Sequence, residues 1–302
     1  MISLSLIIVS YNSSSVIVPC LESLHCLTDV EIIIVDNAST DTTRNLIEVD
    51  FPHVFLIKNS VNKGFAAAAN QGFASASGRW VMFLNPDTVL RVCNIDSIMK
   101  FLKHTNRASV IGCRMVDESG LPQPSCWKAP SLCMLFLDSF LPYRTSRSLI
   151  SEIPQTVREV DMVSGACMIV RREVFDDLGG FDERFFMYYE DADFCLRARK
   201  KNYRIYYTPD ISICHRIANS TDSEKNRFFR YLYASKLTFY KKHFRGIRSL
   251  LAWIFIVSGV VLRIIAYAWI GIFGVNKFQQ LTVNHLGILR MIIRGEWKTP
   301  AK

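Results

Sequence analysis

Three carboxylates crowded into one short stretch are the strongest sign of chemistry in this sequence. Glu190, Asp191 and Asp193 fall at the start of a helix that the residue pattern predicts near 191–201, where the helix dipole lowers the cost of negative charge. Repulsion between them raises the pKa of at least one carboxyl, which brings a general base toward neutral pH. An acidic start that only stabilises its helix is the alternative. The preceding aromatic run, Phe185–Tyr189, favours a pocket.

A second pair of polar side chains has the spacing of a metal site. The segment FLNPDT, Phe83–Thr88, places Asn85 and Asp87 two residues apart at the end of a predicted strand, so both can face one site. A divalent cation that bridges to a diphosphate is the chemical use of such a pair. The neutral amide of Asn85 is a poorer ligand than a carboxylate, and an Asx-Pro turn without a metal is the alternative.

Two further motifs have features of a nucleotide site. In VDNAST, Val35–Thr40, Asp36 stands at a strand end, where it could accept hydrogen bonds from a nucleobase or a ribose. In NKGFAAAANQG, Asn62–Gly72, Gly64 allows close backbone approach at a helix N-terminus, and such a terminus favours anions. Each motif alone is also compatible with ordinary turn and packing roles.

The elements that must position these residues alternate along the first hundred positions. Strands are predicted at 4–10, 30–36, 54–58 and 80–85, with helices near 13–26, 40–49 and 65–75. This alternation predicts an α/β fold with a mostly parallel sheet covered by helices on both faces. Each strand run ends in a polar cluster, and ligands bind at the carboxyl ends of the strands in such sheets. The four clusters are therefore expected to converge on one crevice.

The middle of the chain is less regular. Residues 117–160 are rich in proline and are read as a long irregular excursion. Order returns with a strand at 161–171, a loop at 179–182, the helix near 191–201, a strand at 203–209 and an amphipathic helix at about 225–244.

Composition and charge divide the chain into a neutral body and a basic tail. Half of the 302 residues are hydrophobic and 21% are charged, which excludes a disordered chain and allows a large core. The net charge is +9, and the whole excess falls in residues 241–302, where ten Lys and Arg residues face the single carboxylate Glu296. A tail of this kind is attracted to an anionic surface.

The tail also holds the most apolar stretch of the protein, Ser249–Val275. A spanning helix needs about 20 apolar residues, but Arg263 divides the stretch into pieces of 250–262 and 264–275, and a charge at the bilayer centre costs about 3 kcal/mol or more. We therefore expect an interfacial or re-entrant helix pair with basic flanks. A buried helix that packs on the body or on a second subunit is the alternative. The aromatic and aliphatic setting of the charges fits a membrane better than a nucleic acid.

The N-terminal run and the cysteines bear on the compartment. The apolar run after Met1 ends at Ser10 and has no basic leader, so it does not have the pattern of a signal peptide, and we expect the body to stay in the cytosol. The nine cysteines form no CxxC pair and no His/Cys zinc spacing, which predicts small core residues and no disulfides.

Taken together, Ser10-Tyr11-Asn12, VDNASTD, NxGFAxAxNxG, LNPDT, the SGA…GGFDE segment and FFMYYEDADFCLR resemble the family 2 inverting glycosyltransferases with the GT-A fold. The resemblance covers about residues 3–245, with the motifs in the correct order. Within the family the chain is most similar to the rhamnosyltransferase-like enzymes of bacterial O-antigen and surface polysaccharide assembly. It implies a nucleotide-sugar-binding half at 1–116, an acceptor and catalytic half of the same domain at 117–245, and a membrane-associating helical tail at 246–302.

The resemblance also implies a role for each candidate residue. Asp191 corresponds to the catalytic base, Asp87 takes the metal-ligating place of the family's DxD motif, and His215 can reach metal or diphosphate. Glu190 and Asp193 lie on the acceptor side. The residues implied in nucleotide-sugar binding are Ser10, Tyr11, Asn12, Asp36, Asn62, Lys63, Gly64 and Asn85. The implied cofactor is Mg²⁺ or Mn²⁺, and Asn85 departs from DxD by placing an amide where the motif has its first carboxylate.

The function implied is the transfer of a single sugar with inversion, in one displacement and without a covalent nucleophile. We expect L-rhamnose to move from dTDP-L-rhamnose to N-acetylglucosamine on a polyprenyl diphosphate, at the cytoplasmic face of the bacterial inner membrane. A UDP-hexose donor is the alternative within the family. A nucleotidyltransferase is disfavoured because SYNSSS lacks a Gly-rich loop bearing Lys or Arg, and a processive synthase because no QxxRW motif follows. A non-catalytic membrane-docking protein of the same fold is the last alternative.

Overall fold

The computed structural model describes residues 4–25, 27, 29–92, 99, 108–142, 145, 151–216, 222–272 and 276–298. The chain divides into two compact units, which are described one at a time. The first comprises residues 1–129, 151–183 and 190–218. The second comprises residues 130–150, 184–189 and 219–302. The predictions that concern Cys26, Cys93, Phe273–Val275 and Ile217–Ser220 lie outside the described residues.

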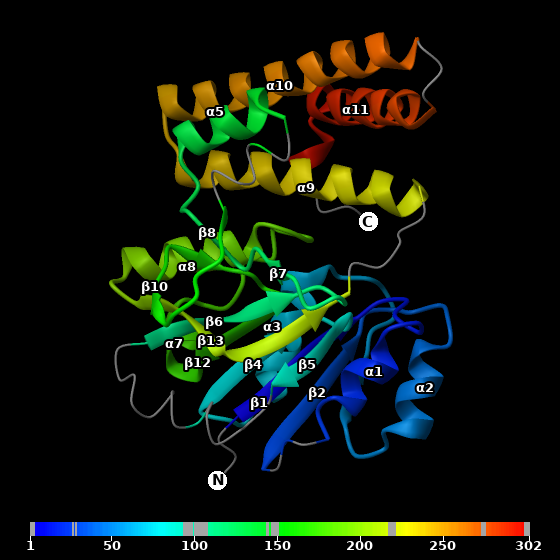
Figure 1. The fold of residues 1–302 in the computed structure, drawn as a ribbon, viewed down its shortest axis with the longest axis vertical. Helices are drawn as coiled ribbons and strands as arrows, with labels where there is room; N and C mark the ends of the chain where they lie inside the picture. Colours follow the sequence, from blue (N-terminus) through cyan, green and yellow to red (C-terminus); the bar gives the residue numbers. More distant parts are fainter. Residues whose placement is uncertain are drawn as a thin grey trace. The chain divides into compact units, whose positions relative to one another are not determined.

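The first unit is built on one large sheet (Figure 1). Its strands lie in the order β10-β13-β6-β12-β4-β1-β2-β3. The bounds are β1 Leu4–Ser10, β2 Val30–Asp36, β3 Phe55–Lys58, β4 Trp80–Leu84, β6 Ala108–Val116, β10 Arg158–Glu159, β12 Cys167–Arg171 and β13 Arg204–His215. Strands β3, β2, β1 and β4 pair in parallel, as do β6 and β13, while β12 runs antiparallel between β4 and β6.

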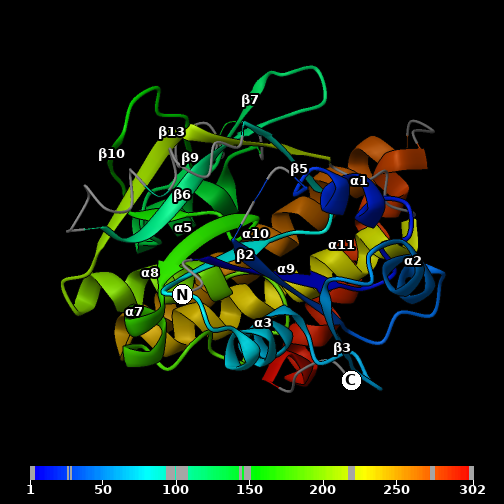
Figure 2. The same cartoon turned by 90° about the horizontal axis from the view of Figure 1, so that it is seen from below.

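Helices cover both faces of this sheet, as the alternation predicted. Residues Leu4, Leu6 and Ile8 of β1 form a buried cluster with α1 (Ile17–Glu22) and α2 (Thr43–Asp50). The opposite face packs on α3 (Phe65–Ser75), where Gly72 approaches so closely that an added Cβ would lie 2.6 Å from Ile7. Figure 2 shows α1 and α2 on one side of the sheet and α3, α7 (Arg172–Asp177) and α8 (Glu190–Lys200) on the other.

The second face is held by a cluster of phenylalanines. Four buried phenylalanine rings pack together, with neighbouring centroids about 5 Å apart. They are Phe83 of β4, Phe175 of α7, Phe181 between α7 and α8, and Phe194 of α8. Each such ring buries 150 Å² or more. This packing fixes α8 on the sheet, and α8 carries the predicted base.

The structure corrects several details of the sequence interpretation. The strand expected at 161–171 is interrupted into β11 (Met162–Val163) and β12, and the strand expected at 203–209 continues to His215. Residues 117–160 are not simply irregular, because they contain β7 (Pro122–Gln123), β8 (Cys126–Trp127), α5 (Leu132–Phe140), β9 (Ser151–Glu152) and β10. The central strand β6 and the short β5 (Thr88–Val92) were not predicted.

The second unit is helical. Its long helices are α9 (Asp222–His243), α10 (Ile247–Gly271) and α11 (Asn276–Arg294), followed by a short 3₁₀ helix at Glu296–Lys298. Helix α5 packs on α10: a Cβ at Gly259 would lie 2.7 Å from the Ser139 carbonyl oxygen, so only glycine permits this approach. The aromatic run before α8 also belongs to this unit, with Phe186 against Tyr231 and Tyr189 against Phe239 of α9.

The expected division of the apolar tail at Arg263 is wrong. Helix α10 runs without a break through Arg263, whose guanidinium donates to the Asp138 carbonyl oxygen at 2.5 Å. That carbonyl belongs to the last turn of α5, where a cation interacts favourably with the helix dipole. The charge is therefore satisfied inside the helical unit, which is why it does not interrupt the helix.

Candidate active site

The loops after β1 and β2 lie side by side at the carboxyl edge of the sheet. Ser10 and Asp36 are direct partners in the parallel register, and the Asn37 N–H donates to the Ser10 carbonyl oxygen at 2.7 Å. Asn12 takes a left-handed φ of 49° and spans the two loops: its N–H donates to Ser39 Oγ, and its side chain accepts from the Thr40 N–H. Tyr11 remains 40% exposed beside it.

One carboxylate oxygen of Asp36 is hydrogen-bonded within the protein, and the other is not. Its Oδ2 accepts from the Arg44 guanidinium at 2.5 Å and from the Ser39 N–H at 3.1 Å, and Arg44 also donates to the Asn59 carbonyl. Its Oδ1 and the Ser10 Oγ are both buried and have no hydrogen-bond partner among the described residues. Since buried polar atoms are nearly always paired, these two atoms fit a ligand that hydrogen-bonds to them.

Asn37 organises the third loop. Its amide donates to Asn62 Oδ1 and to the Gly64 carbonyl, and its Oδ1 accepts from the Lys63 N–H at 3.0 Å. Gly64 has a φ of 82° and directly precedes α3, a conformation that suits glycine. The Lys63 side chain is exposed at the start of this helix. The loop thus brings a cation and a helix N-terminus to the strand edge, where both favour a diphosphate.

Strand pairing brings together the two residues predicted to bind a metal. β5 pairs with β13 so that Thr88 lies opposite His215, and His215 Nε2 is 3.4 Å from Asp87 Oδ2. Asp87 Oδ1 is buried without a partner in the described part of the chain. Burial raises the pKa of Asp87, and the neighbouring His215 acts in the opposite direction.

This pair fits a divalent cation that is completed by a substrate. The Asp87 carboxylate is a ligand of the type that Mg²⁺ and Mn²⁺ both accept, whereas the His215 imidazole suits Mn²⁺ better than Mg²⁺. The two side chains leave positions for water and phosphate oxygens. The described residues contain no cluster of three or more His, Cys, Asp or Glu side chains that would hold a metal unaided. Asn85 is half-buried next to them, with its backbone N–H bound to the Ala166 carbonyl at 3.0 Å.

The predicted base is connected to this edge through the SGA segment. Residues 164–166 follow β11, and the Gly165 N–H donates to Asp191 Oδ2 at 3.0 Å. Because Ala166 binds the backbone of Asn85, Gly165 fixes Asp191 close to the FLNPDT turn. The backbone immediately before α8 is unusual: Tyr188 and Tyr189 both have left-handed φ values, 69° and 67°. Such strain is costly for residues with side chains and is concentrated at functional sites.

Glu190 differs sharply from Asp191. Its side chain is 7% exposed, and its Oε2 is buried without a partner among the described residues. Burial, and secondly the charge of Asp191, raise the pKa of Glu190 well above its ordinary value. A raised pKa, which the sequence predicted from crowding of the carboxylates, is therefore found at Glu190, but burial is its first cause and crowding only its second.

This raised pKa makes folding depend on pH in a defined direction. An acid that holds its proton more tightly in the folded state loses stability as pH rises above its ordinary pKa, near 4.5. We expect Glu190→Gln to stabilise the protein relative to wild type by an amount that grows from pH 4.5 to pH 8, measured by urea denaturation. The exposed Glu22→Gln is the control. A stability difference that stays constant with pH would contradict the prediction.

Asp193 has a different environment from its neighbours. It is fully buried and pairs with Arg197 at 2.7 Å, and Arg197 also donates to the carbonyls of Leu178 and Gly180. The ion pair fixes the turn that precedes the aromatic run. The acceptor-side role implied for Asp193 stays a prediction, and its carboxylate faces Arg197.

Asn70 secures the same turn from α3, and the sequence interpretation gave it no role. Its side-chain amide donates to the Phe181 carbonyl and accepts from the Phe181 N–H, both at 2.9 Å. An added Cβ at Gly180 would lie 2.6 Å from Asn70 Oδ1. A polar side chain within an alanine-rich helix is the sequence signal that could have revealed it. Asn37 and Arg44 also hold the loops of the candidate site in place, and the sequence interpretation gave neither of them a role.

We expect Asn70→Ala to destabilise the protein by about 1–3 kcal/mol, because it leaves two backbone groups of buried Phe181 unpaired. Urea denaturation measures this change. Ser75→Ala, an exposed substitution near the end of the same helix, should change stability by less than about 0.5 kcal/mol. If both variants unfold at the same urea concentration, Asn70 does not secure the turn.

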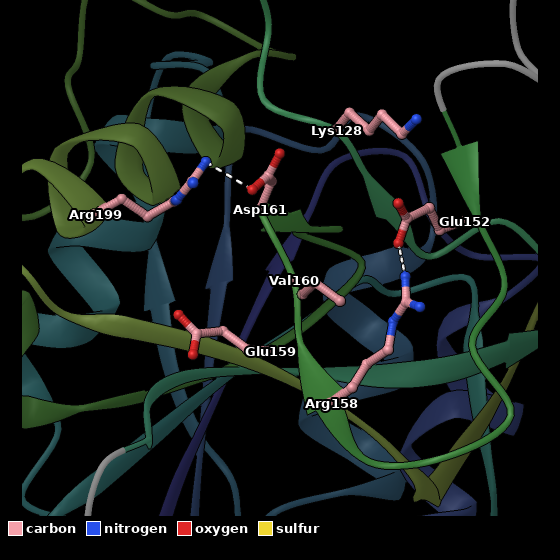
Figure 3. Close-up of a pocket in the computed structure, with 7 residues that line it drawn as sticks. All are labelled: Lys128, Glu152, Arg158, Glu159, Val160, Asp161 and Arg199. Atoms are coloured by element: carbon pink, nitrogen blue, oxygen red, sulfur yellow. Dashed lines mark hydrogen bonds and ion pairs between the residues drawn. The ribbon is translucent and has the colours of Figure 1, made fainter.

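A cavity of about 230 Å³ lies elsewhere in the first unit, lined by Lys128, Glu152, Arg158, Glu159, Val160, Asp161 and Arg199 (Figure 3). Arg199 pairs with Asp161 at 2.8 Å, and Arg158 pairs with Glu152. No residue predicted for the site lines this cavity, and most of its charges neutralise one another. We therefore assign the chemistry to the strand edge.

The sheet edge thus brings together buried carboxylate oxygens that have no partner among the described residues, a helix N-terminus and, on a neighbouring helix, the predicted base Asp191. The model for glycosyl transferase family 2 matches residues 5–179, and the chain belongs to that family. It is a glycosyltransferase that uses a nucleotide sugar.

Two curated relatives are rhamnosyltransferases. The N-acetylglucosaminyl-diphospho-decaprenol L-rhamnosyltransferase of Mycobacterium tuberculosis is 31% identical, over 72% of this chain and 77% of its own. Rhamnosyltransferase WbbL of Escherichia coli is 27% identical, over 75% and 88%. The fold is shared with the mannosyltransferase PcManGT of Pyrobaculum calidifontis, solved with GDP-Man and Mn²⁺, at a TM-score of 0.57, 13% identity and coverage of 98% and 87%.

Proposed function

We propose that the protein transfers L-rhamnose from dTDP-L-rhamnose to N-acetylglucosamine carried on a polyprenyl diphosphate, at the cytoplasmic face of the bacterial inner membrane. The observation that carries the proposal is a series of groups along one edge of the sheet. Strands β1 and β2 end at the paired residues Ser10 and Asp36, and β4, which pairs with β1, ends just before Asn85. Ala166 and Gly165 then link Asn85 to Asp191. The names of the two rhamnosyltransferases above support the choice of sugar and acceptor.

The groups along this series suggest how the reaction proceeds. Asp36 Oδ1, with Tyr11 and Asn12 beside it, binds the nucleoside, while Lys63 and the start of α3 face the diphosphate. Asp191, held by Gly165, takes the proton from an acceptor hydroxyl as that hydroxyl attacks the anomeric carbon. The nucleoside diphosphate leaves from the opposite face, so the anomeric configuration is inverted in one displacement. A general base of this kind contributes about 10²–10⁴ in rate.

Asp87 and His215 would hold a divalent cation together with the donor. The cation would neutralise the negative charge that develops on the leaving diphosphate. Asp87 offers its unpaired Oδ1 for this purpose, and the pairing of β5 with β13 keeps His215 within reach. Asn85, which lies beside them, contributes a neutral amide in place of the second carboxylate of a DxD pair.

The sugar and the nucleobase of the donor can be identified in one experiment. Purified protein is titrated with dTDP-L-rhamnose, UDP-glucose and UDP-N-acetylglucosamine in the presence of Mn²⁺, and nucleoside diphosphate release is followed with a synthetic polyprenyl-diphosphate-linked N-acetylglucosamine. We expect dTDP-L-rhamnose alone to support rapid release. Rapid release from a UDP-hexose would replace the rhamnosyl assignment with the alternative donor. Tight donor binding with no release on any acceptor would instead favour a non-catalytic protein.

A further inference from the structure

Helix α10 presents apolar side chains to solvent near both of its ends. In the described part of the chain it is the helix long and apolar enough to cross a membrane, yet only 22% of its apolar window is buried. Its exposed large side chains recur at helical spacing: Ile247, Leu250, Trp253, Ile254, Leu262, Ile265, Trp269 and Ile270. Contiguous apolar faces of this extent mark interaction surfaces.

The opposite face of α10 is occupied along its length by protein. Ala252, Ile256, Gly259 and Val260 are buried, and Gly259 touches the backbone of α5. Near the end of the helix, Gly271 is buried and its carbonyl accepts from Gln279 of α11 at 3.1 Å. A spanning helix would have to carry α5 and α11 into the bilayer with it. Helix α11 contains Asn276, Gln279, Gln280, Asn284 and Arg290, too many polar groups for that environment.

The position of Arg263 distinguishes a helix that lies on the surface of a membrane from one that crosses it. Its guanidinium binds the Asp138 carbonyl of α5, and Asp138 Oδ2 in turn pairs with Lys236 of α9 at 2.5 Å. The one charge in the middle of α10 is thus directed at the neighbouring helices and away from the apolar face. A helix with one face occupied by protein and the other predominantly apolar suits the surface of a bilayer better than its interior.

Charge and aromatic residues identify the surface that this face fits. Helices α10 and α11 contain no Asp or Glu, while Arg245 and Arg248 are exposed where α10 begins. Trp253 and Trp269 are 44% and 67% exposed on the face itself, and tryptophan is enriched where a membrane meets water. Basic residues at such a boundary are attracted to anionic headgroups.

We propose that α10 lies flat on a bilayer that contains anionic lipid, with its apolar face in the headgroup region and both of its ends on the cytosolic side. The proposal extends the membrane location given under the proposed function, because it specifies which face makes contact and excludes a crossing. It does not depend on the identity of the sugar, and its tests measure binding and topology rather than transfer.

The first test is flotation of the full chain with phosphatidylglycerol–phosphatidylcholine vesicles. We expect the double variant Ile265→Glu/Trp269→Glu to bind about tenfold more weakly or worse, since it removes two large apolar groups and adds repulsion from the lipid. The matched control is Val49→Glu/Phe55→Glu, at equally exposed apolar positions in the first unit, and it should bind as wild type. Circular dichroism checks that both variants are folded. Equal binding by both folded variants would overturn the proposal.

The second test is topology, read with a membrane-impermeant maleimide. Ile272 is 75% exposed just after α10, and Cys133 of α5 is exposed and is replaced by Ser to lower the background. Ile272→Cys should react in inverted vesicles and stay unlabelled in intact spheroplasts. Labelling in spheroplasts would show that α10 crosses the membrane. A purified wild-type dimer that Trp269→Glu makes monomeric, with vesicle binding unchanged, would show that a second copy covers this face.

Discussion

Asp191→Asn should lower turnover by about 10²–10⁴ and leave donor affinity within about twofold of wild type. The reason is that Asn keeps the hydrogen bond from the Gly165 N–H but cannot accept a proton from the acceptor hydroxyl. The loss therefore belongs to the transition state and not to the ground state. Turnover is measured with a lipid-linked acceptor, and affinity is measured by isothermal titration with the nucleoside diphosphate.

Two controls make the result specific to Asp191. Asp50→Asn, an exposed carboxylate at the end of α2, should have no effect on turnover. Glu190→Gln keeps an uncharged side chain at a position where burial already disfavours the charge, so its effect on turnover should be much smaller than that of Asp191→Asn. If Asp191→Asn turns over normally while Glu190→Gln does not, the base has been assigned to the wrong carboxylate.

Asp87→Ala should lower kcat/KM by about 10²-fold or more, because it removes the proposed carboxylate ligand of the cation that neutralises the leaving diphosphate. Donor binding supplies a readout independent of turnover. We expect Mn²⁺ to tighten binding of the nucleoside diphosphate to wild type and to have no such effect on the variant. Both are measured by titration with and without the ion.

Asn85→Asp is the informative partner of this substitution. It restores a second carboxylate beside Asp87 and should lower the concentration of Mn²⁺ at which binding is half-maximal. A wild-type enzyme whose donor binding and turnover are both unchanged by Mg²⁺, Mn²⁺ or a chelator would remove the cation from the proposal. The helix N-terminus at Gly64 and the Lys63 side chain would then be the groups that face the diphosphate.

Local signals in the sequence predicted the donor half well. The bounds of β1, β2 and α3 agree with the predicted ranges at 4–10, 30–36 and 65–75, because alternating or continuous apolar runs bounded by turn residues are specified within a few positions. The convergence of the polar clusters followed from the parallel order of the strands. The roles assigned to individual site residues remain predictions for the experiments above.

What escaped prediction depends on contacts between distant segments. The run ASVIGCRMV, which forms β6, has the composition of a strand, but its place in the middle of the sheet comes from pairing with β12 and β13. The break in the strand at 161–171 reflects the bond from Gly165 to Asp191, 26 residues away. Similarly, Arg263 was read as an interruption because its partner, the Asp138 carbonyl, lies 125 positions earlier.

The ion pair between Asp138 of α5 and Lys236 of α9 has a consequence for the synthesis of the protein on the ribosome. Asp138 is made 98 residues before Lys236 and 125 residues before Arg263, the two cations that bind it. At a synthesis rate of about 5–20 residues per second, α5 waits roughly 5–20 s for the first of them. During that interval the nascent chain carries an apolar nine-residue helix whose native partners in α9 and α10 have not yet been made.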